Sequence, residues 1–312
     1  LTAAEAEPEY FRPDKVISTG GSKRGIATAT AGIHDDRFTG IMPVVAPPMG
    51  NPGTPAAIIG TEPAWIEGQD RRLLETVDPS IRRSLEQRKL RRDATRLTLA
   101  EVKAQAWSDN DIVSLNNRLW TAARITDHLA SVDKRKLVYF YNAGTNDSVT
   151  PALLELGRKF PDFPIFIVPG GQHGGPSDAG YTRRVTMQSG VVNNFDSFCR
   201  HHFFGARDLP DAPKITAKRK GGALLVTTRF SKNAHPQKNE LSWSFSRHQP
   251  YSLAFEYDRW ESVVMTSTGK NTWVAEIPLP DKVKSIQFLS THVDMQNKLP
   301  FAISSPLNEM QL

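Results

Sequence analysis

The sequence predicts an α/β fold in its first two thirds, built on a mostly parallel sheet covered by helices, and a β-sandwich after it. In the first part, strand candidates alternate with helical segments and are apolar on both faces, which is typical of a buried parallel sheet. After residue 208 the pattern changes to strand-like runs separated by Gly, Asn, Lys and Pro. We therefore expect an α/β domain at 1–208 and an Ig-like β-sandwich at 209–312.

The strands of the parallel sheet are predicted from short apolar runs bounded by glycine or proline. These runs are residues 15–19, 38–47, 135–144 and 163–171. The helices expected to follow strands cover about 22–32, 151–160 and 181–204. Residues 56–130 contain no convincing strand, so we expect a helical cap inserted between two strands of the sheet.

The second part is predicted to contain only strands and turns. The expected strands are residues 222–230, 240–247, 251–260, 272–280 and 285–293. Regular spacing of such runs without helical segments favours a sandwich of two antiparallel sheets.

Composition excludes several classes of protein. Hydrophobic residues make up 39% of the chain and charged residues 23%, as in ordinary soluble domains. No window approaches the roughly 18 apolar residues that a membrane span needs. The single cysteine, Cys199, excludes an internal disulfide framework. Basic residues outnumber acidic ones in segment 71–103, but nothing beside it resembles a nucleic-acid module. We interpret the segment as a solvated amphipathic helix, and a patch for phosphates or acidic substrates is the alternative.

The stretch KVISTGGSKRGIATATAG, residues 15–32, places Ser22 between a predicted strand and a predicted helix. A nucleophilic serine is often held on such a sharp turn, with glycines that relieve crowding of the backbone. Gly20 and Gly21 precede Ser22, whereas the usual glycine two positions later is Arg24, and Gly25 follows it. Ser22 is thus a candidate nucleophile, and its alternative role is that of a helix N-cap.

Two further residues strengthen the catalytic interpretation. Asp147 follows the strand 135–144 in GTNDSV, and His173 follows the strand 163–171 in QHGG. Because ligands of open α/β sheets gather at the carboxyl ends of strands, we expect these side chains at one edge. Serine, then aspartate, then histidine is the chain order of α/β-hydrolases. Asp147 is alternatively a turn residue, and His173 a structural histidine.

No cofactor or metal is expected. GGSKRG superficially resembles a phosphate-binding loop but lacks the order of a P-loop. His201 and His202 have no acidic partner at metal-ligand spacing, and no zinc or calcium motif occurs in the sequence.

The motifs STGGSKRG, NAGTNDSV and VPGGQHGG resemble the PhoPQ-activated pathogenicity-related family of α/β-hydrolases. The elbow is also similar to that of prolyl tri- and tetrapeptidyl aminopeptidases. This resemblance implies an α/β-hydrolase fold with a C-terminal β-rich extension. It also implies Ser22 as nucleophile, Asp147 as the acid of the triad and His173 as the base. A secreted or periplasmic location is expected from the same resemblance.

One departure from the α/β-hydrolase pattern concerns the start of the chain. That fold has several strands before the nucleophile strand, whereas few residues precede the elbow here. We therefore expect an N-terminal portion of the same precursor to complete the fold. Within this chain, the backbone N–H of Lys23 is the expected oxyanion donor.

These features predict a serine hydrolase that cleaves an ester or amide by acyl transfer, with a carboxylesterase-type activity on a small-molecule substrate. Trp65, Trp107 and Trp120 of the predicted cap are the expected pocket residues. A serine exopeptidase is the first alternative, with Glu62 or Glu67 holding the amino terminus of a peptide. A catalytically silent, hydrolase-like binding protein is the second.

Overall fold

The fold is taken from a computed structural model. It describes residues 14–50, 63–95, 101, 104–173, 185–187, 190–192 and 194–312.

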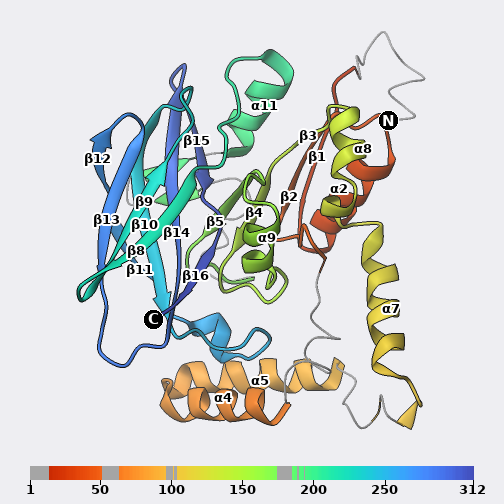
Figure 1. The fold of residues 1–312 in the computed structure, drawn as a ribbon. Coiled ribbons are helices and arrows are strands. Elements are labelled where there is room, and N and C mark those ends of the chain that lie inside the picture. Colours follow the sequence, from red (N-terminus) through yellow and green to blue (C-terminus); the bar gives the residue numbers. More distant parts are fainter. Residues whose placement is uncertain are drawn as a thin grey trace.

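A sheet of parallel strands lies at the centre of the molecule (Figure 1). Its strands are β1 (Ile17–Gly21), β2 (Gly40–Val44), β3 (Val138–Tyr139), β4 (Tyr141–Gly144) and β5 (Ile165–Val168). Their order is β1-β2-β4-β5, and β3 pairs with β2. The pairs are in parallel register, with Gly21 opposite Val44 and Gly144 opposite Val168. The carboxyl ends of β1, β4 and β5 therefore meet at one edge of the sheet.

One face of this sheet is covered by helices. They are α2 (Lys23–His34), α8 (Leu129–Lys134) and α9 (Leu153–Lys159). Side chains that alternate along the strands, such as Ile41, Tyr141 and Ile167, pack in one core with Ile33 of α2 and Leu156 of α9. Removing this apolar surface from water stabilises the fold by about 25 cal/mol per Å².

The opposite face packs against the second half of the chain. Met42, Phe140 and Phe166 lie in a core with Phe198 of α11 (Asn194–Phe204) and Phe301 of β15 (Leu299–Ser304). Phe140 and Phe301 meet edge to face, with ring centroids 4.6 Å apart. The backbone N–H of Ile167 also donates to Ser304 Oγ at 2.9 Å.

Two antiparallel sheets form most of the second half of the chain and stand on the left in Figure 1. One has the order β11-β10-β14-β15, with β16 paired to β14, and the other has the order β12-β13-β9-β8. Their core includes Val226, Leu241, Ile277 and Phe288. The remaining bounds are β8 (Lys214–Lys220), β9 (Ala223–Arg229), β10 (Pro236–Phe245), β11 (Glu261–Val264), β12 (Thr266–Gly269), β13 (Thr272–Pro278), β14 (Ser285–Gln296) and β16 (Asn308–Gln311).

Between β2 and β3 the described residues are mainly helical. Besides α8, the elements are α4 (Pro63–Thr76), α5 (Pro79–Thr95), α7 (Asp109–Thr121) and the 3-10 helix η2 (Ile125–Asp127). Helices α4 and α5 lie side by side beneath the rest of the molecule (Figure 1). Asp70 of α4 accepts a 2.6 Å hydrogen bond from the backbone N–H of Leu253. Ile66 of the same helix packs on Tyr251.

The prediction of an α/β-hydrolase fold with a mostly parallel sheet covered by helices is wrong. In the described ranges five strands form the parallel sheet, and the other strands pair antiparallel in sheets of five, four and two strands. Helices α2, α8 and α9 cover one face of the parallel sheet, but β15 of an antiparallel sheet packs on the other together with α11. Strands that are apolar on both faces predict burial, and burial alone does not distinguish a covering helix from a covering sheet.

Two predicted elements are also wrong. The helix expected over 181–204 begins only at Asn194, and a hairpin of β6 (Val185–Met187) and β7 (Gly190–Val192) precedes it. The strand expected over 251–260 is instead a set of turns around the 3-10 helix η3 (Ala254–Tyr257). There the side chain of Asp70 and the hydroxyl of Ser252 accept the backbone N–H groups of Leu253 and Phe255, which a sheet would otherwise pair.

Candidate active site

Ser22 occupies the turn between β1 and α2. Its φ of 57° and ψ of −124° lie in a region that residues other than glycine rarely adopt. The backbone N–H of Ser22 donates to the carbonyl of Val44 at 3.0 Å, which fixes the turn to the neighbouring strand. Its side chain makes no capping hydrogen bond to α2, although Ser22 stands at the N-cap position. The hydroxyl on this strained turn is therefore not used as a helix cap.

Glycines allow this turn to pack closely. A Cβ at Gly25 would lie 2.7 Å from the carbonyl oxygen of Val44 and 2.8 Å from that of Gly20. A Cβ at Gly20 would lie 2.8 Å from the Cβ of Arg24. The regular elbow pattern has a glycine two positions after the serine. Here Gly25, three positions after Ser22, takes its place, because this is the residue that lies against the strands.

Asp147 and His173 form a hydrogen-bonded pair. Asp147 Oδ2 lies 3.2 Å from His173 Nδ1, and Asp147 Oδ1 accepts the backbone N–H of Val149 at 2.8 Å. The side chain of Asp147 is fully buried, whereas that of His173 is 31% exposed. Because an ionised carboxylate only accepts hydrogen bonds, this contact places the proton of a neutral imidazole on Nδ1. Asp147 thus acts as a turn residue through one oxygen and orients a histidine through the other.

Ser22, Asp147 and His173 all follow strands of the parallel sheet at the same edge. Ser22 follows β1, Asp147 comes after β4 and His173 after β5. Asp147 and His173 are in contact, but among the described residues no hydrogen bond joins the Ser22 hydroxyl to His173. Catalytic hydrogen bonds are often long before substrate binds.

Lys23 is the first residue of α2 and is exposed. The first four N–H groups of a helix have no acceptor within it, and the positive end of the helix dipole lies there. The backbone N–H of Lys23 therefore lies directly after Ser22 at the positive end of α2.

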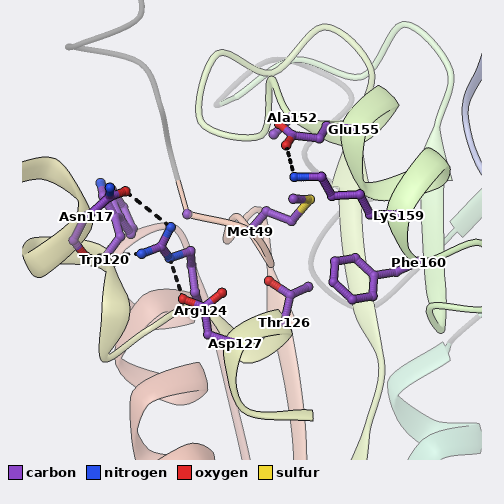
Figure 2. A pocket seen from close by; sticks show the side chains of 11 residues that line it. Met49, Asn117, Trp120, Arg124, Thr126, Asp127, Ala152, Glu155, Lys159 and Phe160 are labelled. Carbon is purple, nitrogen blue, oxygen red and sulfur yellow. Dashed lines mark hydrogen bonds and ion pairs between the residues drawn. The ribbon is translucent and has the colours of Figure 1, made fainter. Parts of the chain in front are cut away.

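The three tryptophans expected to shape a pocket have different surroundings. Trp120 lines a cavity of about 250 Å³ between α7 and α9, together with Met49, Arg124 and Phe160. Figure 2 shows Arg124 turned toward Asp127, with Nε–Oδ2 at 3.0 Å, and Lys159 turned toward Glu155.

Trp107 is 41% exposed, and Trp65 belongs to α4 but its side chain lies outside the described part of the chain. Two further cavities lie beside Thr150 and Leu153. None of these three cavities is lined by Ser22, Asp147 or His173.

Of the residues proposed to hold a peptide amino terminus, Glu67 is exposed on α4 and Glu62 lies outside the described residues. No cluster of three or more His, Cys, Asp or Glu side chains suited to a metal ion occurs in the described ranges. Within the same ranges, none of the helices is both long and apolar enough to span a membrane.

Sequence reasoning missed the segment 246–260, which surrounds the Asp147 turn. The side chain of Arg247 is 4% exposed, and its Nη2 donates to the carbonyl of Thr145 at 3.0 Å and to Asn146 Oδ1 at 2.8 Å. Burial lowers the pKa of Arg247, and the nearby Asp258 carboxylate opposes this effect. The only sequence signal is a set of polar residues, such as Arg247 and Asp258, inside runs that the sequence pattern predicts to be strands.

No protein-family model and no curated protein sequence matches the chain. The solved structures that are similar to it include three with low sequence identity and low TM-scores. The chicken interferon gamma receptor alpha chain is 15% identical, with a TM-score of 0.24 over 32% of this chain and 50% of that chain. A DUF3823 family protein from Bacteroides ovatus is 9% identical, with a TM-score of 0.23 over 48% of this chain and 60% of that chain.

The superoxide reductase from Nanoarchaeum equitans is 12% identical, with a TM-score of 0.19 over 32% of this chain and 91% of that chain. The chain thus matches half of the receptor and 60% of the DUF3823 protein.

Proposed function

We propose that the protein is a serine hydrolase that cleaves an ester or amide by acyl transfer. The observation that carries this proposal is the contact of 3.2 Å between buried Asp147 and His173, at the sheet edge where Ser22 is held at a φ of 57°. A serine hydroxyl is a poor nucleophile unless a base removes its proton and a third group orients that base. The three side chains are of the types that this chemistry requires.

In the proposed reaction, Ser22 Oγ attacks the carbonyl carbon of the substrate while His173 Nε2 accepts its proton. Asp147 holds the imidazole with its proton on Nδ1 and stabilises the imidazolium that forms. The N–H of Lys23 donates to the developing oxyanion. His173 then protonates the leaving group. In the second half of the reaction His173 accepts a proton from water, the water oxygen attacks the acyl carbon, and the bond to Ser22 Oγ breaks as His173 returns the proton to Oγ.

The proposed activity is of the carboxylesterase type. Hydrolysis of p-nitrophenyl acyl esters by the wild type and by Ser22→Ala tests it, with proline-containing aminoacyl amides assayed in parallel. We expect ester hydrolysis that is lost in Ser22→Ala. Cleavage of the amides alone would assign an exopeptidase, and no activity in folded wild type would leave a protein that acts by binding. Membership of the PhoPQ-activated family and a secreted or periplasmic location stay predictions.

A further inference from the structure

Arg247 links the antiparallel half of the chain to the turn that precedes Asp147. Its guanidinium reaches four acceptors, and the side chains of Arg247 and its partner Asp258 are only 4% and 5% exposed. Nε donates to Asp258 Oδ2 at 3.1 Å and Nη1 donates to Gln287 Oε1 at 3.1 Å. Nη2 donates to Thr145 and Asn146. The guanidinium carbon also lies 4.3 Å from the centroid of the Phe255 ring.

Asn146, the residue before Asp147, forms hydrogen bonds through its side chain with segment 246–260. Its Oδ1 accepts from Arg247 Nη2 at 2.8 Å and from Trp260 Nε1 at 2.9 Å. Its Nδ2 donates to the carbonyl of Asp258 at 2.8 Å. Asn146 is 2% exposed, so water does not compete for these contacts. The position of the next residue, Asp147, is thereby fixed.

The loop that carries His173 is held by the same residues. Gln172 Nε2 donates to the carbonyl of Glu256, which also accepts from Asn146 Nδ2 at 3.3 Å. The backbone N–H of Asn146 donates to the carbonyl of Gly171 at 2.9 Å. Gly170 N–H donates to Thr145 Oγ1 at 2.7 Å. The turn of Asp147 and the loop of His173 are thus joined to each other and to segment 246–260.

We propose that Arg247 is a positioning residue for the Asp147–His173 pair. This inference rests on the proposed function, since a positioned carboxylate matters for chemistry only if His173 acts as a base. A guanidinium suits this role because its rigid fork donates in several directions at once, whereas a lysine ammonium is a point charge on a flexible stem. Small displacements of catalytic groups reduce rates strongly, so the fork contributes to catalysis without touching the substrate.

The test uses Arg247→Lys, which keeps the buried positive charge beside Asp258. We expect kcat for ester hydrolysis to fall about tenfold or more. We expect KM to change less than about twofold, because the side chain of Arg247 is only 4% exposed. In Asp147→Asn, the same Arg247→Lys change is expected to add almost nothing, since the group that it positions is already disabled. If Arg247→Lys only destabilised the fold, it would instead lower kcat by the same factor in the wild type and in Asp147→Asn.

A second readout does not depend on activity. Long-range proton–nitrogen NMR of protein labelled at histidine nitrogens reports which ring nitrogen of His173 carries the proton, with His173→Gln used to assign the signals. The wild type is expected to hold the neutral ring with its proton on Nδ1, facing Asp147. In Arg247→Lys a mixture of the two tautomers is expected.

Arg207→Lys is the matched control. Arg207 is another buried arginine paired with an aspartate, Asp294, but it belongs to the segment after α11 and contacts β14 and β15. Its replacement is expected to leave the tautomer and kcat unchanged. Trp260→Phe removes one donor to Asn146 and is expected to shift the tautomer in the same direction, by less.

The outcomes separate the two proposals. If folded Arg247→Lys keeps both the wild-type tautomer and the wild-type kcat, the positioning role is overturned. If wild type and Ser22→Ala hydrolyse esters equally slowly, the proposed function fails, and the tautomer measurement still decides whether Arg247 orients the pair. If Arg247→Lys does not fold, Trp260→Phe decides: an unchanged tautomer there contradicts the role.

Discussion

Asp147 Oδ2 and His173 Nδ1 lie 3.2 Å apart, and their side chains differ in exposure from 0% for the carboxylate to 31% for the imidazole. The carboxylate is held by the sheet edge and its turn, while the imidazole reaches toward solvent. A base that must exchange a proton with substrate needs access, whereas the group that orients it benefits from burial. This asymmetry is the arrangement that the proposed acyl transfer requires.

Asp147→Asn is predicted to lower kcat by about 10³- to 10⁴-fold. The amide keeps the size of the carboxylate but does not stabilise an imidazolium, and its NH₂ group favours the wrong tautomer of His173. Steady-state hydrolysis of an activated ester measures the change. Asp196→Asn on the exposed surface of α11 is the control and should retain wild-type kcat. Equal rates in the two variants would exclude Asp147 from the mechanism.

Gly25→Ala is predicted to disturb the Ser22 turn. The new methyl group would lie 2.7 Å from the carbonyl oxygen of Val44, so α2 must move away from the strands at a cost of about 1–3 kcal/mol. Gly21→Ala is the control, because nothing lies within 4 Å of its Cβ position. Thermal unfolding and ester hydrolysis measured on both variants test the difference. A Gly25→Ala variant as stable and active as Gly21→Ala would contradict the packing argument.

The buried ion pair of Arg207 and Asp294 is predicted to be sensitive to loss of one partner. Both side chains are at least 96% buried, so Asp294→Ala would leave an uncompensated arginine and lower the free energy of unfolding by about 3–5 kcal/mol. Arg200 and Asp196 form a half-exposed pair on α11, and Asp196→Ala should cost no more than about 1 kcal/mol. Urea denaturation distinguishes the two results, and similar losses in both variants would refute the prediction.

His292 is predicted to make stability depend on pH. It lies opposite Asn239 on paired strands, fully buried, with its ring 4.2 Å from that of Phe230. Burial, with a smaller contribution from Arg207, lowers the pKa of His292 from 6.5 to about 3. Below pH 6.5 the unfolded chain binds a proton on this histidine that the folded chain does not. The contribution of His292 to the free energy of unfolding is therefore highest above pH 6.5 and declines as the pH falls toward about 3.

Urea denaturation between pH 4 and 7 measures this effect. One proton corresponds to a slope of about 1.4 kcal/mol per pH unit in the free energy of unfolding. In His292→Leu the slope of the free energy of unfolding against pH should be smaller by the contribution of this one proton. In His235→Gln, at an exposed position, the slope should equal that of the wild type. An unchanged slope in His292→Leu would show that this histidine is not responsible.

Local sequence patterns predicted several elements well. The apolar runs at 15–19, 38–47 and 163–171 correspond to β1, β2 and β5, and the helix expected at 151–160 corresponds to α9. Their strand and helix signals are local, so propensity and periodicity are sufficient to find them. The contact of Asp147 with His173 followed from strand ends meeting at one edge of a parallel sheet.

Long-range packing was not predictable in the same way. The sequence does not show that Phe301 of β15 would cover the face of the parallel sheet that carries Phe140, because both a helix and a sheet can bury an apolar strand. Nor does it show that Arg247 would reach Asn146, about a hundred residues away in the chain. The residues 251–260 have the composition of a strand, but Asp70 of a distant helix accepts one of their backbone N–H groups.

The central claim is that Ser22 is an activated nucleophile, and covalent labelling with a fluorophosphonate probe tests it most directly. The phosphorus atom should become bonded to Ser22 Oγ with loss of fluoride, so the intact mass should rise by one adduct and peptide mapping should place it on Ser22. Ser22→Ala should remain unlabelled, and Asp147→Asn should be labelled much more slowly. Folded wild type that stays unlabelled, or that carries its adduct on another residue, would contradict the account.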